Sequence, residues 1–363
     1  MADRVTWLVG GQLLLPDGVR RGAVAMAGGR IRAIRSAPSR GGRHINVRGA
    51  FISPGFVDLH VWGPPTILSR ELVKQGTTAF LASLGPSEPE RLLSELETLA
   101  SIRAHVAGAR CLGAHLEGPF VNPARGGALP RRSMRPAHPR ELRQLARYRD
   151  HIRMMTLAPE LPGAIEAIRW CRRNGITASL GHTDADARIA EHAAAAGATA
   201  VTHLFNGMRG FHHREPGLLG WALTDPRLQA MVIPDGVHTD PLALRVAAAS
   251  KGRGGVVLVT DSIQRQSAPR YGLKRHEAFY TAEGALAGSA LRMNRAVWNA
   301  MRFGKLSLSD AVGMASANPA RLIGRSDLGR LAPGARADLV ILDARLGVRM
   351  TIVGGSIVYK RRA

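Results

Sequence analysis

The sequence predicts a closed parallel α/β barrel that carries a small β-sandwich made from both ends of the chain. Strand-like and helix-like segments alternate through the middle of the chain, a pattern typical of parallel strands joined by helices. Both ends instead contain short strands separated by glycine turns. We therefore expect residues 54–326 to form the barrel, and residues 1–53 and 327–363 to pair as the β-sandwich.

The two ends of the chain repeat one strand-and-turn pattern. Near the N-terminus, residues 22–26 and 30–34 flank Gly28-Gly29, and a glycine pair between two apolar runs indicates a hairpin turn. Gly354-Gly355 plays the same part in the tail. The strands expected in the tail cover residues 338–343, 349–353 and 356–359.

Five segments of the middle region have apolar residues at the spacing of an amphipathic helix. They cover residues 88–103, 139–149, 164–174, 185–196 and 241–250. Apolar, strand-like runs lie between them, so the segments follow one another as strand, helix, strand. This order implies that the parallel sheet closes into a barrel.

The composition indicates a globular protein without a membrane segment. The chain has 363 residues, of which 45% are hydrophobic, enough for one large α/β domain and a small appendage. No apolar stretch approaches the roughly 20 residues that span a bilayer. Gly10-Gly11 and Pro16 break the N-terminal apolar run, which argues against a signal peptide. Cys111 and Cys171 are the only cysteines, which favours buried thiols in a reducing cytoplasm.

The charge of the chain is strongly positive, at +23, yet the pattern does not favour nucleic-acid binding. Only five of the 50 basic residues are lysine, and the arginines are scattered without interleaved aromatic residues. An arginine excess of this kind is typical of a coding bias. The positive field would favour an anionic small molecule such as a phosphate ester.

Several apolar runs end in a residue that can bind a metal or move a proton. These residues are Glu117, His182, His203 and Asp261, with His60 at the end of a further run. In a parallel barrel the C-terminal ends of the strands meet at one mouth. Two imidazoles and one carboxylate form a three-ligand metal site with a position open for water. Asp261 would serve as base and then acid, unless it merely caps a following helix. The pattern predicts a metal-dependent hydrolase.

Eight short motifs occur in one order along nearly the whole chain. They are PGFVD (54–58), HLEGPF (115–120), GHT (181–183), THLFNGM (202–208), REPG (214–217), DGVH (235–238), VTD (259–261) and LAGSAL (286–291). In this set the chain resembles the N-acetylglucosamine-6-phosphate deacetylases, a branch of the amidohydrolase superfamily. The resemblance implies a TIM-like (β/α)8 barrel with a small β-sandwich, usually dimeric, that removes acetate from an amino sugar phosphate.

The resemblance also implies the roles of individual residues. Glu117, His182 and His203 would hold one divalent metal, and Asp261 would be the catalytic aspartate. Zinc suits two histidines and a carboxylate best, and iron, manganese and cobalt are alternatives. Sugar-phosphate contacts would come from Asn206, Gly207, Arg214, His238 and Ala128, and from the backbone of Leu286, Ala287 and Gly288. Arg214 has the planar fork that suits a phosphate, with a solvated surface role as its alternative.

Three departures from the family pattern affect the site. Many amidohydrolases bind a second metal with His-x-His after the first strand, whereas this chain has His60-Val61-Trp62. We therefore expect one metal, with His60 either a ligand or a structural residue. Leu129 stands where the deacetylases carry a histidine that polarises the acetyl carbonyl. Losing such a donor can cost about a hundredfold in rate unless His138 or Arg131 replaces it.

The third departure is the segment after Asp261, residues 262–271, which is bulkier and more basic than in the family. Loops at the mouth of a barrel set the shape of the substrate. Three functions therefore stay open: the N-acetylglucosamine-6-phosphate deacetylase, a divergent hydrolase of another N-acyl amino sugar or related amide, and a sugar-phosphate-binding homologue without catalysis. A small-molecule substrate, a homodimer and a cytoplasmic location are expected, with neither nucleic acid nor membrane as a partner.

Overall fold

Eight parallel strands form the barrel in the computed structural model, which describes residues 5–264, 272–274 and 278–362. In order they are β6 (Phe56–Trp62), β7 (Thr77–Leu84), β8 (Arg110–Glu117), β9 (Ile152–Leu157), β10 (Thr177–Leu180), β11 (Ala200–Val201), β12 (Gln229–Val232) and the pair β13 (Val256–Leu258) and β14 (Ser262–Ile263). β13 pairs with β12, and β14, four residues further on, pairs with β6. Because this eighth stretch of chain bonds to both β12 and β6, the barrel closes, and the predicted fold class is confirmed.

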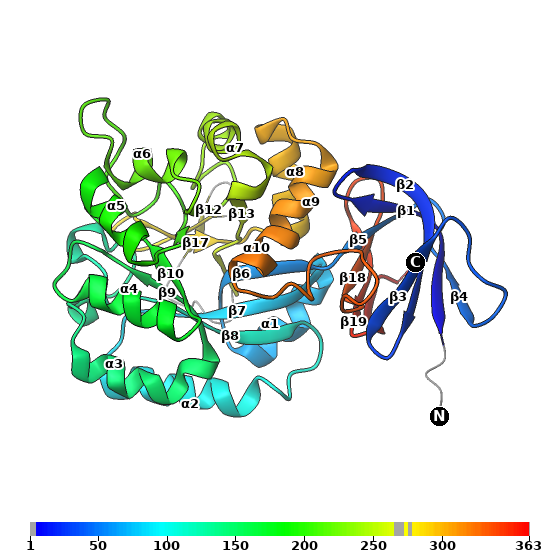
Figure 1. Ribbon diagram of the computed structural model, residues 1–363, viewed down its shortest axis with the longest axis horizontal. Coiled ribbons are helices and arrows are strands. Elements are labelled where there is room, and N and C mark those ends of the chain that lie inside the picture. Colours follow the sequence, from blue (N-terminus) through cyan, green and yellow to red (C-terminus); the bar gives the residue numbers. More distant parts are fainter. Residues whose placement is uncertain (1–4, 265–271, 275–277, 363) are drawn as a thin grey trace.

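Helices connect the strands and surround the barrel (Figure 1). They are α1 (Pro65–Leu72), α2 (Pro89–Ile102), α3 (Pro139–Leu145), α4 (Ala164–Arg173), α5 (Ala187–Ala196), α6 (Gly217–Thr224), α7 (Pro241–Gly255), α8 (Met293–Gly304), α9 (Leu308–Ala315) and α10 (Ala317–Leu322). All five segments predicted to be helical are so, and the residues after α3 continue as a 3-10 turn over Ala146–His151. Among the described residues, no helix is both long and apolar enough to cross a bilayer.

The two ends of the chain lie together in one small sheet beside the barrel (Figure 1). Its strands are β1 (Thr6–Leu15), β2 (Gly18–Ala27), β3 (Arg30–Arg35), β4 (Arg43–Asn46), β5 (Phe51–Pro54), β18 (Leu339–Leu342), β19 (Val348–Val353) and β20 (Ser356–Lys360). β5 joins the two ends, since it pairs with β1 on one side and β18 on the other. A separate apolar core, including Leu8, Ile52 and Ile341, stabilises this unit. The domain limits at residues 53 and 327 stay a prediction.

Three short strands extend the barrel sheet beyond its closed ring. They are β15 (Gly272–Lys274), β16 (Ala278–Tyr280) and β17 (Leu286–Ser289), and β17 pairs with β14 next to Asp261. Much of the third sequence departure, residues 265–271, lies outside the described residues. Cys111 and Cys171 are both free and buried, as the composition predicted.

Candidate metal centre and substrate pocket

Three side chains from different strands meet at the mouth of the barrel. Oε1 of Glu117, the last residue of β8, lies 3.0 Å from Nε2 of His182 and 3.0 Å from Nε2 of His203. The two Nε2 atoms are 3.1 Å apart, and all three residues are buried. One carboxylate and two imidazoles whose donor atoms converge in this way suit a divalent metal with an open coordination position. The structure therefore brings together the three ligands that the sequence predicted.

Backbone carbonyls orient both histidines toward this centre. Nδ1 of His182 donates to the carbonyl oxygen of Arg125 over 2.8 Å, and Nδ1 of His203 donates to that of Asn206 over 3.1 Å. A carbonyl can only accept, so each ring carries its hydrogen on Nδ1 and presents the Nε2 lone pair to the centre. Metal-binding histidines are commonly held by such outer partners.

The Arg125 carbonyl is itself held by an ionic cluster. The Arg125 guanidinium donates to Asp184 over 2.8 Å, and Arg209 binds the same carboxylate over 2.8 Å. Hydrogen bonds from Arg209 and Arg125 lower the pKa of Asp184 to about 2. The carboxylate therefore stays charged at any physiological pH and fixes the loop that orients His182.

The electrostatics of Glu117 favour the ligand form of its side chain. Burial alone would raise the pKa of Glu117, but the charge of His60 and the close imidazoles of His182 and His203 lower it well below the usual range. A carboxylate held in its charged form at the centre of two imidazoles attracts a cation.

The backbone at the site is strained. His182, His203 and Asp261 have φ values of 48°, 32° and 48°, and Phe205, next to the site, has 81°. A side chain in this left-handed region costs free energy, and such residues cluster at functional sites. Of the four residues that the sequence predicted as ligands and base, all but Glu117 therefore have a strained backbone conformation.

His60 links the metal ligands to Asp261. It is fully buried at the end of β6, with Nε2 3.2 Å from Oε2 of Glu117 and 3.3 Å from Oδ1 of Asp261. Burial opposes a charge on this ring, but the carboxylates of Glu117 and Asp261 raise the pKa of His60 to about 9. His60 lies outside the set of three converging ligands, and a structural role, as an ionic partner of both carboxylates, fits its contacts.

Asp261 lies between β13 and β14 and faces the same centre. Its Oδ1 accepts a hydrogen bond of 2.9 Å from Nε1 of Trp62, and its backbone N–H donates to the carbonyl of His60. The neighbouring Thr260 hydroxyl donates to buried Asp58 over 2.6 Å, which fixes the strand. The alternative in which Asp261 caps a following helix is wrong, because strand β14 follows it.

His115 supports the site from within the barrel. Its Nδ1 donates to the carbonyl of Leu59 over 2.9 Å, and its Nε2 lies 2.7 Å from the Thr156 hydroxyl. Burial lowers the pKa of His115 to about 3, so the ring is neutral. A neutral, fully bonded imidazole is a packing residue and not a ligand.

A pocket of about 210 Å³ is lined by Glu117, His182 and His203. Most of the predicted substrate contacts line it together with Asp261: Asn206, Gly207, His238, Ala128, Leu286, Ala287 and Gly288. Sequence reasoning did not assign Gly127, Ile233 or Ala285 to the site, although they also line it. Gly127 and Ala285 each adjoin a residue that was assigned, and this adjacency was the only available signal.

Arg214 is the one predicted substrate residue that the structure does not bring into the pocket. It lies exposed on the loop before α6, where its Nη1 is 3.0 Å from Nε2 of His213. A bridge between His212 and Glu215 turns this loop back on itself, and no residue of the loop from His212 to Glu215 lines the pocket. In the single chain, Arg214 therefore lies at the surface, which is the alternative that the sequence analysis gave for it.

Leu129 gives the pocket an apolar wall. It lines the pocket, whereas neither residue suggested as its replacement does. Nδ1 of His138 accepts the backbone N–H of Arg140 at the start of α3, and Arg131 is exposed. His138 and Arg131 are both exposed and lie outside the pocket lining, so in this structure neither is placed to replace the donor missing at Leu129.

His238 lines the pocket and is paired with a carboxylate. Its Nδ1 lies 2.6 Å from Oδ2 of Asp235, whose other oxygen accepts the backbone N–H groups of Val237 and His238. Burial opposes protonation of His238, but the hydrogen bond and charge of Asp235 outweigh it and raise its pKa above the ordinary value of 6.5. The imidazolium form therefore persists to a higher pH than in a free histidine.

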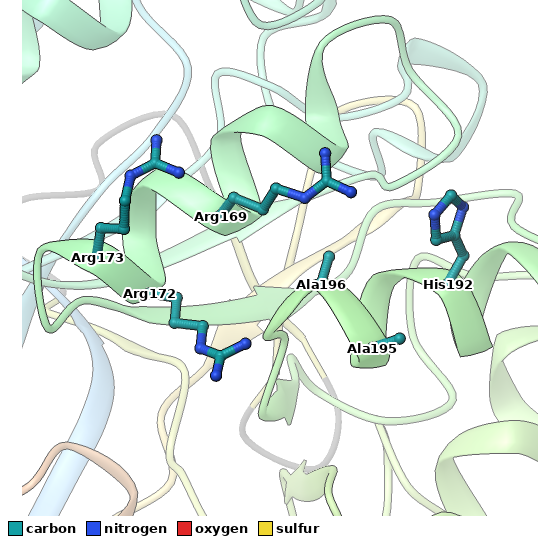
Figure 2. Close-up of a pocket in the computed structure, with 6 residues that line it drawn as sticks. All are labelled: Arg169, Arg172, Arg173, His192, Ala195 and Ala196. Carbon is teal, nitrogen blue, oxygen red and sulfur yellow. The ribbon is translucent and has the colours of Figure 1, made fainter.

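A second hollow, of about 450 Å³, lies on the outer helices α4 and α5. It is lined by Arg169, Arg172, Arg173, His192, Ala195 and Ala196. Figure 2 shows that the three guanidinium groups point in different directions. Without a converging donor set, this surface lacks the features of a catalytic site, and the pocket at the barrel mouth is the functional candidate.

Comparisons with known proteins agree with this geometry. Residues 51–358 match the sequence model of the amidohydrolase family. The chain is 36% identical to an N-acetylglucosamine-6-phosphate deacetylase of Bacillus subtilis, over 84% of each chain. It is 33% identical to an N-acetylgalactosamine-6-phosphate deacetylase of Escherichia coli O157:H7, over 97% of this chain and 95% of the relative.

Solved structures show the same relationship. A mutant N-acetyl-D-glucosamine-6-phosphate deacetylase from Mycobacterium smegmatis, in complex with N-acetyl-D-glucosamine-6-phosphate, superposes with a TM-score of 0.89 at 31% identity. The match covers 99% of this chain and all of that one. The chain therefore belongs to the N-acetylglucosamine-6-phosphate deacetylase family of amidohydrolases.

Proposed function

We propose that this protein hydrolyses the acetamide of N-acetylglucosamine 6-phosphate, releasing acetate and leaving glucosamine 6-phosphate. One observation carries the proposal: the ligand set of Glu117, His182 and His203 shares a pocket with Asp261 and with seven of the eight expected substrate contacts. Membership of a deacetylase family supports it.

The residues present fit a metal-assisted hydrolysis. A divalent metal, for which we propose zinc, would lower the pKa of a coordinated water and polarise the acyl oxygen. Asp261 accepts a proton from the attacking water, while the oxygen of that water bonds to the acyl carbon. Asp261 then returns that proton to the sugar nitrogen as the C–N bond breaks, so that acetate and the free amine leave. Leu129 supplies no hydrogen bond to the acyl oxygen.

Binding of the phosphate end of the substrate is expected to depend on the charge of His238. Because Asp235 raises the pKa of His238, substrate binding should be strongest below that pKa and weaken as the pH rises through it. Asp235→Asn removes the raising interaction, so the rise in KM should begin at a lower pH. The measurement is KM against pH for both proteins, and coincident profiles would contradict this role for the pair.

A second candidate substrate is the galactosamine epimer. A relative from Escherichia coli O157:H7 at 33% identity is named for N-acetylgalactosamine 6-phosphate, and its match covers 97% of this chain. Leu129 in the pocket wall also favours some divergence from the family pattern. The reaction type would be the same for either sugar.

The deciding experiment is acetate release by zinc-reconstituted protein, with metal-stripped protein as the control. The substrates are N-acetylglucosamine 6-phosphate, its galactosamine epimer and unphosphorylated N-acetylglucosamine. We expect metal-dependent turnover that is fastest with the first compound and much slower without the phosphate. Faster turnover of the epimer would select the second candidate, and no acetate from folded, metal-loaded protein would overturn both.

We also propose that the protein is a cytoplasmic homodimer. The location is supported by two free, buried thiols, which suit a reducing compartment. The dimer is supported by the resemblance to a family that is usually dimeric. Sedimentation velocity at micromolar concentration tests the dimer, and a monomer there would contradict it.

A further inference from the structure

Trp62 lines the pocket without a role assigned to it so far, and it contacts Asp261 directly. Its Nε1–H donates to Oδ1 of Asp261 over 2.9 Å. Side chains two residues apart on a strand share a face, so Trp62 lies on the same face of β6 as His60. Both reach the same oxygen, since Nε2 of His60 lies 3.3 Å from Oδ1. Within the part of the chain that the structure describes, Oδ2 of Asp261 has no hydrogen-bond donor.

The indole of Trp62 packs against a glycine, whose missing side chain makes room for the ring. Gly85 follows β7, and a Cβ added at this glycine would come within 3.2 Å of Cη2 and 3.4 Å of Cζ3 of Trp62. The same Cβ would be 3.8 Å from Cδ2 of Leu129, so the indole and Leu129 lie over one glycine. A side chain at position 85 would press on the outer edge of the ring, which would have to shift by a few tenths of an ångström.

We propose that Trp62 is a positioning residue for Asp261, whose Oδ1 it fixes so that Oδ2 carries the proton during hydrolysis; this inference rests on the proposed function. An indole nitrogen donates a hydrogen bond but neither accepts one nor titrates. It therefore orients the carboxylate without competing for the proton that Asp261 must receive and return. A base that is correctly oriented before the reaction avoids the cost of ordering it in the transition state.

The kinetic test is a double-mutant cycle between Trp62 and Asp261. Trp62→Phe keeps an aromatic ring and removes the N–H, and should lower kcat by about tenfold or more while KM changes little. In the Asp261→Asn background the same substitution should cause no further loss, because its effect acts through the carboxylate. Additive losses would overturn the proposal, as would an unchanged kcat in Trp62→Phe.

Two matched variants separate this role from general packing. Trp298→Phe, on α8, removes a buried indole N–H that has no hydrogen-bond partner among the described residues, and should leave kcat unchanged. Gly85→Ala keeps Trp62 but crowds its ring, and should lower kcat in the same direction as Trp62→Phe. A wild-type rate in Gly85→Ala would show that the indole position does not matter.

A measurement without turnover keeps this inference distinct from the proposed function. In protein labelled with ¹⁵N, the five tryptophans give five indole N–H resonances, and that of Trp62 is identified by its loss in Trp62→Phe. Asp261→Asn should shift this resonance more than the other four. An unmoved resonance would overturn the proposal, whether or not the protein releases acetate. Absence of acetate from the wild type would count only against the proposed function.

Discussion

Asp261→Asn is expected to lower kcat for acetate release by about 10²- to 10⁴-fold, the usual contribution of a general acid–base residue. Asparagine has nearly the same shape as aspartate, but its amide cannot take a proton from water near neutral pH. The metal ligands Glu117, His182 and His203 are unchanged in this variant, so metal content and substrate affinity should be retained. Steady-state kinetics, metal analysis and calorimetric titration with substrate measure the three quantities.

Asp186→Asn is a matched control for this variant. Asp186 is the N-cap of α5, where its side chain accepts the backbone N–H of Ile189. Asparagine caps helices about as well as aspartate, so this variant should keep the wild-type kcat. If Asp261→Asn also kept it, another group would have to move the proton, and the role assigned to Asp261 would be wrong. A binding protein without catalysis would show no relevant change in either variant.

The fold could be predicted because its determinants are periodic. Amphipathic spacing located the helices α2, α3, α4, α5 and α7, and their alternation with apolar runs indicated the barrel. Other helices could not be predicted from amphipathic spacing, for physical reasons. α6, for example, is apolar around most of its circumference and so lacks a polar face to define its period. The sequence also left open which strand closes the ring, which depends on the register of β14 against β6.

The sequence predicted most residues of the site, but not the path of every loop or the contacts between side chains. Glu117, His182, His203 and Asp261 each follow or end an apolar strand run, and the barrel brings such ends together whatever the loops do. Arg214 lies on a long loop, whose path is set by contacts of its own, and the structure places it outside the pocket. Trp62 was noticed only as the residue that interrupts His-x-His. Its bond to Asp261 depends on a neighbouring strand 199 residues away in sequence, which spacing alone does not reveal.

Glu117→Gln is expected to remove the metal and with it nearly all activity, by about a thousandfold or more in kcat/KM. Glu117 is buried, and its carboxylate contacts His60, His182 and His203 at once. Glutamine keeps the shape of the side chain but loses the charge that attracts a cation. Metal content after dialysis should therefore fall to the background level, and added zinc should not restore acetate release.

Glu141→Gln is the matched control, because Glu141 is also a buried carboxylate with a cationic partner, Arg135, but lies on α3. This variant should keep its metal. Thermal unfolding adds a readout independent of activity, since a ligand that binds only the folded state raises Tm with its concentration. Zinc should raise the Tm of the stripped wild type and of Glu141→Gln, but not that of Glu117→Gln. If zinc stabilised all three equally, the metal would bind elsewhere, and the role of Glu117 would be confined to pairing with the buried imidazoles around it.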